Sequence, residues 1–258
     1  MNLISPIYKL YKAWLKRQIK NGDETRQPPH HIGIILDGNR RFAREKGLDV
    51  WKGHQFGAAK INAVLDWCWE AGIKIVTIYS FSTENFSRPI KEVAEIMKIA
   101  VQKFEEILTN PKIHSREVRV KAIGRVKDLP KSVQESITRA EEATKHYDKH
   151  YLNVAISYGG RAELVDAFRN IASLIEEGEI EPNEVTERTV EQFLYTSGIP
   201  DPDLIIRTSG EERLSGFLLW QSAYSELYFA DVFWPEFREI DLLRAIRTYQ
   251  HRKRRFGS

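Results

Sequence analysis

The chain has 258 residues, 42% of them apolar, so it can fill the core of one large domain or two small ones. Its formal net charge of +3 excludes a uniformly polycationic protein, so basic residues matter only where they cluster. The single cysteine, Cys68, excludes an intrachain disulfide framework or a thiolate zinc site, and no apolar run approaches the roughly 20 residues that span a bilayer. The N-terminus has no continuous signal-peptide core, so we expect a cytoplasmic protein.

The first 20 residues have the pattern of an amphipathic helix, because apolar residues recur at helical spacing and lysines fill much of the remainder. The polar stretch over 21–30 is predicted to be a linker. We therefore divide the chain into a helix and linker over 1–30 and a main domain over 31–258.

Strands and helices alternate through the main domain, which predicts an α/β fold with a central, mostly parallel sheet flanked by helices. In chain order we expect strands over 31–36, 73–81, 117–124, 151–160 and 203–210, and helices over 55–71, 92–108, 130–147, 161–178 and 239–253, with the short apolar pieces "FLLW" and "ELYFA" before the last helix.

Polar segments rich in glycine and arginine follow four of these strands, and ligands of open parallel sheets bind at the carboxyl ends of the strands. Arginines and backbone amides at glycine turns suit phosphate oxygens. An aspartate among them needs a bridging cation, and Mg²⁺ is commonly held by one or two carboxylates plus phosphate oxygens. The segments are "DGNRR" (37–41), "FSTENFSRP" (81–89), "YGGR" (158–161) and "RTSGEER" (207–213).

One polar strand end alone is usually a solvated loop, and the standard phosphate-binding motifs G-x-x-x-x-G-K-[ST] and G-x-G-x-x-G are both missing. Adjacent histidines at 30 and 31 point to opposite faces of a strand, which argues against a metal site there. The prediction of a Mg²⁺–diphosphate site therefore depends on the four strand ends together.

Taken in order, four long motifs resemble those of the cis-prenyltransferase family, whose best-known members are the undecaprenyl diphosphate synthases. The resemblance covers roughly 30–257, and the aspartate-rich motif of trans-prenyltransferases is missing. The motifs are "HIGIILDGNRRFAREKG", "YSFSTENFSRP", "SYGGRAELVDA" and "DLIIRTSGEERLSGFLLWQSAYSELYFADVFWPEF".

The resemblance implies a homodimeric, Mg²⁺-dependent transferase. Such an enzyme condenses isopentenyl diphosphate repeatedly onto an allylic primer, farnesyl or geranylgeranyl diphosphate, and makes each new double bond cis. The expected product is a long-chain, undecaprenyl-like polycis-polyprenyl diphosphate, a precursor of glycosyl carrier lipids.

At the first strand end, the resemblance implies that Asp37 holds Mg²⁺ and is the most sensitive catalytic position. The residues expected to cradle the allylic diphosphate are Gly38, Asn39, Arg40 and Arg41, with Phe42 beside them and His54 in contact with the diphosphate region.

At the second strand end, Asn85 is expected close to the reacting carbons. A neutral amide is a poor base, so we expect it to orient the substrate while a diphosphate oxygen takes the proton. The other residues expected along the substrate path are Ser82, Thr83, Glu84, Phe86 and Arg88.

At the fifth strand end, the resemblance implies that Arg207, Arg213 and Ser215 bind the diphosphate of isopentenyl diphosphate, with Leu214 in the same substrate-binding loop. Glu226 should supply a second carboxylate for Mg²⁺ across the dimer.

The C-terminal residues Arg255 and Gly257 resemble the family's R-x-G motif, which reaches into the partner's active site. Taken alone, this segment would be interpreted as a frayed basic tail. With the resemblance, it predicts a substrate-binding element and a dimer complete in one kind of chain.

Two features depart from many bacterial members. Val50 stands where those members have arginine, and the form "DGNRR" together with the N-terminal extension looks more like archaeal or eukaryotic members. Primer preference and product length therefore stay open.

A long apolar product needs an apolar tunnel, and its candidate walls are the strand over 73–81 and the helix over 92–108. Some of Val93, Ile96, Met97 and Ala100 are expected on the tunnel wall, with ordinary core packing an equally weighted alternative. The N-terminal helix has three alternatives: peripheral contact with a membrane, capping the tunnel mouth, or packing on the body.

Two other readings account for less of the sequence. A nucleic-acid-binding module would use the basic stretches at both ends but leaves the four strand ends unexplained, so we expect no nucleic-acid partner. A non-catalytic partner subunit is the alternative function, but such subunits lose the Asp and Arg of the first strand end, and this chain has Asp37, Arg40 and Arg41.

Overall fold

Six parallel strands form one sheet in the order β3-β4-β2-β1-β5-β6, which confirms the predicted α/β fold. The computed structural model describes residues 6–20 and 27–252; residues 1–5, 21–26 and 253–258 lie outside the description. The strands are β1 (His31–Ile35), β2 (Ile75–Ser82), β3 (Val118–Ile123), β4 (His150–Tyr158), β5 (Leu204–Thr208) and β6 (Glu226–Ala230).

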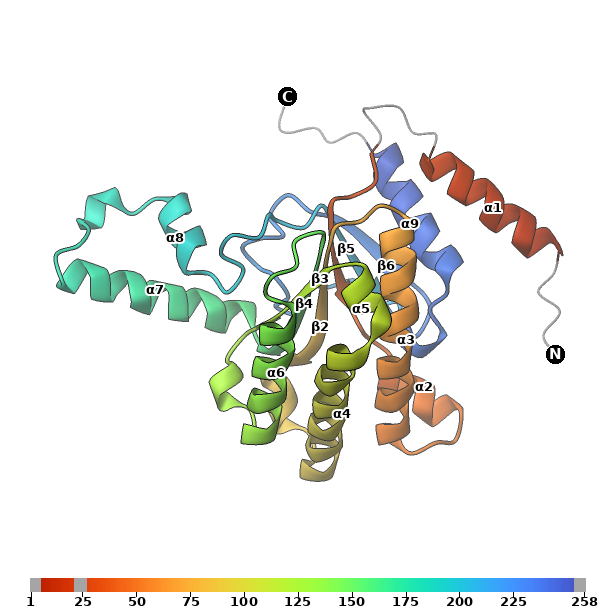
Figure 1. Cartoon of the computed structure of the whole chain (residues 1–258), viewed down its shortest axis with the longest axis horizontal. Coiled ribbons are helices and arrows are strands. Elements are labelled where there is room, and N and C mark those ends of the chain that lie inside the picture. Colours follow the sequence, from red (N-terminus) through yellow and green to blue (C-terminus); the bar gives the residue numbers. More distant parts are fainter. Residues whose placement is uncertain (1–5, 21–26, 253–258) are drawn as a thin grey trace.

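Helices α3, α4 and α6 lie side by side over the sheet, while α7 and α8 extend away from the body (Figure 1). The helices are α1 (Pro6–Lys20), α2 (Asn39–Glu45), α3 (Val50–Glu70), α4 (Ile90–Thr109), α5 (Pro111–Ser115), α6 (Lys131–Thr144), α7 (Gly160–Glu176), α8 (Glu187–Phe193) and α9 (Glu239–His251), with 3₁₀ turns η2 (Thr83–Ser87), η3 (Val126–Asp128), η4 (Pro182–Glu184) and η5 (Trp234–Glu236). Within the described ranges, no helix combines the length and the apolar character needed to cross a membrane.

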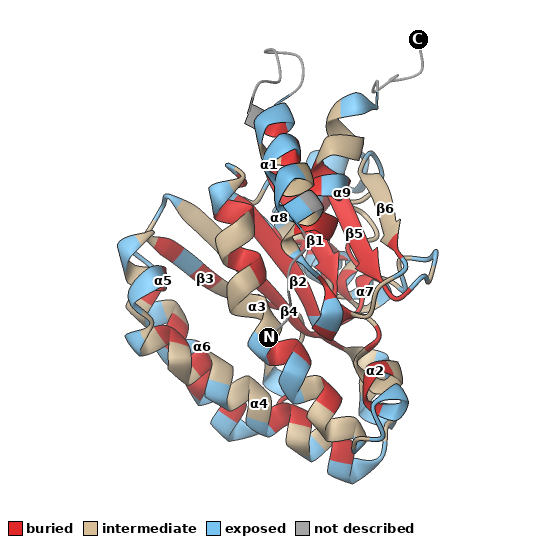
Figure 2. Cartoon of the chain, turned by 90° about the vertical axis from the view of Figure 1, so that its right-hand side faces the viewer, coloured by how far each residue is buried: buried red, intermediate tan, exposed pale blue. Residues whose placement is uncertain are grey.

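The central strands are buried on both faces, as near-continuous apolar runs in parallel sheets require (Figure 2). All five residues of β1 and of β5 are buried. His31, within β1, is also buried: its ring hydrogen-bonds the carbonyl of Pro200 and the hydroxyl of Thr77. Both ring nitrogens are therefore occupied within the fold, which leaves no metal ligand at this position.

Helix α1 packs against α9, so one of the three alternatives for the N-terminal helix holds in the structure. Leu15 and Ile19 are buried in the core cluster, and Lys12 and Lys16 form ion pairs of 2.9 and 2.5 Å with Glu239 on α9. α1 lines none of the cavities described below. Residues 21–26 of the predicted linker lie outside the described residues.

Three short helices were not expected from the sequence: α2, α5 and α8. The apolar piece "ELYFA" forms the edge strand β6, whereas "FLLW" (217–220) forms turns. These differences leave the sheet unchanged and place a helix, α2, directly after the first strand end.

Candidate active site

Asp37 lies just beyond β1, near the middle of the sheet, where the chain turns into α2. The backbone turns at Gly38, whose φ of 101° is left-handed, and a Cβ there would lie 2.8 Å from the Phe233 ring. One carboxylate oxygen of Asp37 accepts a hydrogen bond from the Gly38 amide at 2.7 Å. The first strand end therefore needs glycine at 38 and holds the aspartate in a fixed position.

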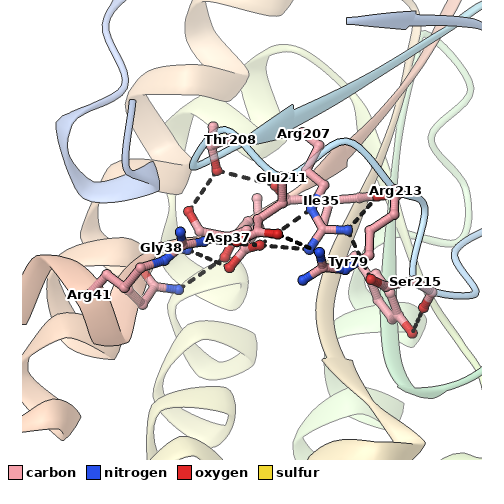
Figure 3. A network of polar contacts seen from close by, with 12 residues as sticks. Ile35, Asp37, Gly38, Arg41, Tyr79, Arg207, Thr208, Glu211, Arg213 and Ser215 are labelled. Carbon is pink, nitrogen blue, oxygen red and sulfur yellow. Dashed lines mark hydrogen bonds and ion pairs between the residues drawn. The ribbon is translucent and has the colours of Figure 1, made fainter. Parts of the chain in front are cut away.

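Arg207, at the end of the neighbouring strand β5, connects Asp37 to the following loop (Figure 3). Its guanidinium donates to the second carboxylate oxygen of Asp37 from Nη2 at 2.7 Å and Nε at 3.3 Å. Its Nη1 donates to the Arg213 carbonyl and, at 2.8 Å, to the Ser215 hydroxyl. Arg207 is only 4% exposed, so this guanidinium joins the two strand ends as a fixed element.

The backbone at Asp37 is held by a second set of bonds. The Thr208 hydroxyl donates to the Asp37 carbonyl at 2.7 Å, and the Trp234 amide donates to the same oxygen at 2.9 Å. Arg41 reaches back from α2, with Nη2 3.8 Å from the Asp37 carboxylate and 3.1 Å from Glu211. The carboxylate therefore faces guanidinium groups from both β5 and α2.

Asn85 belongs to a capping box at the end of β2. Its side-chain oxygen accepts a hydrogen bond from the Ser82 amide at 3.2 Å, and the Ser82 side chain caps the same turn of η2. Because the oxygen is occupied, the amide nitrogen is the group that Asn85 can present to a ligand. The geometry supports an orienting role for Asn85 over a role as base.

Glu92, at the start of α4, is only 8% exposed, and its carboxylate contacts one histidine and two arginines. Its carboxylate lies 3.0 Å from His54 Nε2 and 3.5 Å from guanidinium nitrogens of both Arg40 and Arg88. Burial lowers the pKa of His54 despite the opposite effect of Glu92, so the ring is neutral and Nε2–H is the donor.

A pocket of about 820 Å³ lies at the carboxyl end of the sheet, between Asp37, Arg207, Asn85 and His54. The pocket brings together most of the predicted site residues: Asp37, Gly38, Asn39, Arg40, Arg41, His54, Ser82, Thr83, Glu84, Asn85, Arg88, Arg207 and Ser215. Six arginines and two carboxylates contribute to its wall, so its charge favours an anion.

A narrower apolar cavity of about 110 Å³ lies between α3, α4 and the sheet. It shares four residues with the polar pocket: Leu36, Asn39, His54 and Ser80. At its far end, Glu106 joins the two helices, with 2.6 Å contacts to Asn62 of α3 and to Lys103 of its own helix. The site therefore combines a cationic pocket with an adjoining apolar cavity.

The four residues of α4 that were expected on the tunnel wall divide between two cavities. Ile96 and Ala100 line the 110 Å³ cavity, and Ile78 of β2 lines it too. Val93 and Met97 line a separate outer groove between α4 and α6. Residues three or four apart share one face of a helix, so Ile96 and Ala100 lie on one face of α4 and Val93 and Met97 on the neighbouring face.

Four predicted substrate-binding side chains lie off the pocket wall. Phe42 is buried against Phe56, and Phe86 lines the outer groove while packing on Phe81. The other two are Arg213, whose side chain pairs with Glu211 while only its carbonyl meets Arg207, and Leu214, which packs into a small apolar cluster.

Glu226 lies at the opposite end of the sheet from Asp37 within one chain. It is in register with Leu204, which pairs with Ile32, five residues before Asp37. At about 3.3 Å per residue, the offset along the strands is about 16 Å, with two strand spacings in addition. The two carboxylates of one chain are therefore too far apart to share an ion, and a joint role would require a second copy of the chain.

Arg252 forms an ion pair of 2.6 Å with Glu226 and is the last described residue before the predicted R-x-G segment. Arg255 and Gly257 lie outside the described residues. Glu226 therefore lies beside the last described residue of the chain, so a second protein that bound this end of the chain would also contact Glu226.

A family model described as "Putative undecaprenyl diphosphate synthase" matches residues 35–257, nearly all of the main domain. The chain belongs to this family. Since its curated relatives are named as diphosphate synthases and isoprenyl transferases, it is a prenyl transferase that elongates prenyl chains in the cis configuration. The resemblance seen in the sequence is thereby confirmed, and the non-catalytic alternative is not supported.

Similar proteins occur in archaea, bacteria and plants. The tritrans,polycis-undecaprenyl-diphosphate synthase (geranylgeranyl-diphosphate specific) of Methanopyrus kandleri is 52% identical over 98% of this chain and 92% of its own length. The isoprenyl transferase of Thermus thermophilus is 50% identical over 99% of this chain and 97% of its own. Lavandulyl diphosphate synthase from Lavandula x intermedia, solved with dimethylallyl diphosphate, has a TM-score of 0.85 at 37% identity, covering 92% of this chain and 100% of its own.

Two arginines of this prenyl transferase line the polar pocket but were not predicted as site residues: Arg44 and Arg161. Arg44 lies one helical turn after Arg40, so predicting α2 would have placed it. Arg161 ends the segment "YGGR", a strand end that the sequence already marks as polar. This chain has Val50 where many bacterial members have arginine, but Arg44 supplies a cation on the α2 wall of the pocket.

Proposed function

We propose that this prenyl transferase catalyses Mg²⁺-dependent, sequential condensation of isopentenyl diphosphate onto an allylic diphosphate, giving a long-chain polycis-polyprenyl diphosphate. One observation carries the proposal: an arginine-rich pocket adjoins an apolar cavity, and four residues line both. A prenyl diphosphate has the same division, with two phosphates at one end and hydrocarbon at the other.

The polar half of the site fits two diphosphates. Arg40, Arg41 and Arg88 lie on the α2–α4 side of the pocket and suit the allylic diphosphate. Arg207 and Ser215 lie on the β5 side and suit the diphosphate of isopentenyl diphosphate. Asp37 lies between the two groups of arginines, where both substrates meet.

Asp37 fits a Mg²⁺ ion held mainly by substrate. No three His, Cys, Asp or Glu side chains within the described ranges form a ready-made metal site, so protein ligands alone would leave most positions of an octahedral ion unfilled. One carboxylate among arginines suits an ion whose other ligands are phosphate oxygens and water. When bound, Mg²⁺ would neutralise charge on the leaving diphosphate.

The reaction breaks the allylic carbon–oxygen bond, and diphosphate leaves with the electron pair. The double bond of isopentenyl diphosphate forms the new carbon–carbon bond, and a proton then leaves the isopentenyl carbon. We assign that proton to a diphosphate oxygen, because the Asn85 oxygen is already bonded to the Ser82 amide. Arginine side chains stabilise the charge that develops on the leaving group.

The apolar half of the site holds the start of a growing chain. An apolar cavity of about 150 Å³ admits a benzene-sized ligand. A cavity of about 110 Å³ therefore holds roughly one five-carbon unit. A long product would require α3 and α4 to separate further, and the Asn62–Glu106 hydrogen bond between these helices would have to open.

A homodimer would complete the site. Glu226 and Arg252 lie together beside the edge strand β6, and Glu226 cannot reach Asp37 of its own chain. A two-fold dimer would deliver Glu226 and the R-x-G segment, Arg255 and Gly257, to the partner's site. Val165 and Phe168 on the projecting helix α7 are 43% and 52% exposed and offer apolar area for association.

We propose geranylgeranyl diphosphate as the preferred primer, because the archaeal relatives of about half identity are named as specific for it. Farnesyl diphosphate is the second candidate. The product would serve as a precursor of glycosyl carrier lipids made in the cytoplasm. A lipid product also implies peripheral contact with a membrane.

Incubation with labelled isopentenyl diphosphate, Mg²⁺ and each primer in turn tests this function, with products sized by chromatography. We expect a ladder ending in long chains, lost with EDTA and in Asp37→Ala. A folded dimer that incorporates no label with any primer would refute the proposal. Incorporation that stops after one unit would refute the long-chain product alone.

A further inference from the structure

At one end of the molecule α1 lies against α9, and much of its outer side is exposed (Figure 2). The residues of this surface are mainly basic and aromatic. α1 carries five lysines and arginines and no acidic residue. On its outer side, Leu10 is 71% and Trp14 40% exposed. Leu10, Trp14 and Arg17 are spaced by four and three residues, so they share one face of the helix. This face points away from the core that holds Leu15 and Ile19.

The aromatic side chains of this surface are fixed by arginines from α9. Arg247 lies over the Trp14 ring at 4.5 Å, and Arg244 lies over the Tyr11 ring at 5.4 Å. Trp14 and Tyr11 also stack on each other, with ring centroids 5.7 Å apart. The exposed indole is therefore held at the surface beside two guanidinium groups, and its position depends on the packing of α1 on α9.

The charge of this surface exceeds what its own acids neutralise. A groove of about 460 Å³ beside α9 is lined by Arg244, Arg247, His251 and Arg252. Among the neighbouring acidic residues, Glu239 pairs with lysines of α1, Asp241 pairs with Arg238 and Arg244, and Glu226 pairs with Arg252. Lys9 and Arg17 are exposed and form no ion pair with any described residue.

We propose that the α1–α9 surface, comprising the outer face of α1 and the arginines of α9, docks on an anionic membrane. Exposed leucine and tryptophan beside lysines and arginines are the combination that enters the headgroup region of a bilayer. The positive charge complements anionic lipid headgroups, each cation contributing to binding. A nucleic acid would use the cations but gives no reason for Leu10 to be exposed.

The position of this surface matches the proposed path of the product; this step alone rests on the proposed function. The apolar cavity reaches Leu65 on α3, and Lys16 of α1 contacts Glu70 at the end of the same helix, at 3.4 Å. Five residues of helix separate Leu65 from Glu70, about 7.5 Å. A chain that outgrew the cavity would emerge near the docked membrane.

Flotation of the full-length chain with vesicles tests the proposal without any catalytic step. We expect binding to vesicles of phosphatidylglycerol and phosphatidylcholine, little binding to phosphatidylcholine alone, and weaker binding at high salt. Leu10→Glu should weaken binding at least tenfold, because an apolar contact is replaced by a charge. Lys9→Gln together with Arg17→Gln should weaken it about 30-fold.

Matched controls come from the opposite end of the molecule. Ile90 is 87% exposed, so Ile90→Glu makes the same change as Leu10→Glu outside the surface. Lys127→Gln with Lys131→Gln removes two exposed cations elsewhere that, like Lys9 and Arg17, form no ion pair with a described residue. All variants should keep the wild-type melting temperature, and the control variants should bind vesicles as the wild type does.

Three outcomes would overturn the proposal. The wild-type chain could ignore anionic vesicles, or Leu10→Glu could bind them as tightly as Ile90→Glu does. Alternatively, Leu10→Glu could lower the oligomeric mass in lipid-free buffer while vesicle binding stays unchanged, which would identify the α1–α9 surface as a contact between copies of the chain. None of these results depends on whether the chain elongates prenyl diphosphates.

Discussion

Replacing Ala100 by leucine tests whether the apolar cavity holds the growing chain. Ala100 lines the 110 Å³ cavity from α4. A leucine-to-alanine change in a core can leave a cavity of about 150 Å³. The reverse change therefore adds a side chain that fills most or all of this space.

The expected result is a shorter product and an undisturbed fold. A leucine that enters the cavity gains about 1.5–3 kcal/mol from burial, and overpacking costs about 1–3 kcal/mol, so the free energy of unfolding should change by no more than about 2 kcal/mol. The first condensation should be slowed less than later additions, because the polar pocket is untouched. Later additions should slow sharply, which shifts the product ladder toward short chains.

Val101→Leu is the matched control, because Val101 is the next residue of α4 but lines the outer groove instead. It should leave the ladder unchanged. Chromatography of labelled products from both variants at equal enzyme concentration makes the comparison. If Ala100→Leu gave the wild-type ladder while Val101→Leu shortened it, the chain would run through the outer groove and the cavity assignment would be wrong.

Two further changes test parts of the fold and site. Arg207→Lys keeps a positive charge but cannot bridge Asp37 and Ser215, so kcat/KM for isopentenyl diphosphate should fall tenfold to a hundredfold, and unchanged steady-state kinetics would contradict the bridging role. Burial lowers the pKa of His31 to about 4, below the value near 6.5 in the unfolded chain. The neutral ring therefore stabilises the folded state by up to about 3 kcal/mol above about pH 6.5, and this contribution is lost as the pH falls toward 4. Urea unfolding at pH 7.5 and 5 should show this loss, and His31→Gln should reduce it; an equal loss in the variant would rule out His31 as its source.

The sequence predicts the sheet well, because each buried strand is a short run of apolar residues between polar ends. Boundaries agree within a few residues for all five expected strands, and β6 lies in a piece recognised as apolar. Short helices are harder to predict, since seven residues such as 39–45 span barely two turns and α2 is mainly polar. Its residues have the composition of a ligand loop, and only the structure shows that they begin a helix.

The site was predicted where chemistry and chain position coincide. Asp37, Arg41 and Arg207 are charged residues at strand ends, and a parallel sheet brings such ends together. Phe42 and Leu214 lie off the pocket wall, because an apolar residue near a site can equally face the core, and sequence spacing does not distinguish the two orientations. For the same reason the sequence does not show that Val93 and Ala100, both apolar residues of α4, line different cavities.

Mixing two inactive variants decides whether Glu226 acts across a dimer. Asp37→Asn and Glu226→Gln should each be inactive if one site needs both carboxylates. After unfolding and refolding an equal mixture, about half of all dimers contain one chain of each kind. If Glu226 serves the partner's site, each such dimer has one site with Asp37 from one chain and Glu226 from the other.

That arrangement predicts recovery of about a quarter of wild-type activity, since half of the dimers carry one intact site of two. If Glu226 served its own chain, every site in the mixture would lack one carboxylate and no activity would return. The second result would contradict the register of β1, β5 and β6, which separates Glu226 from Asp37 of the same chain by more than about 15 Å. Refolded wild type under the same conditions sets the scale, and its recovery shows that subunits reassociate.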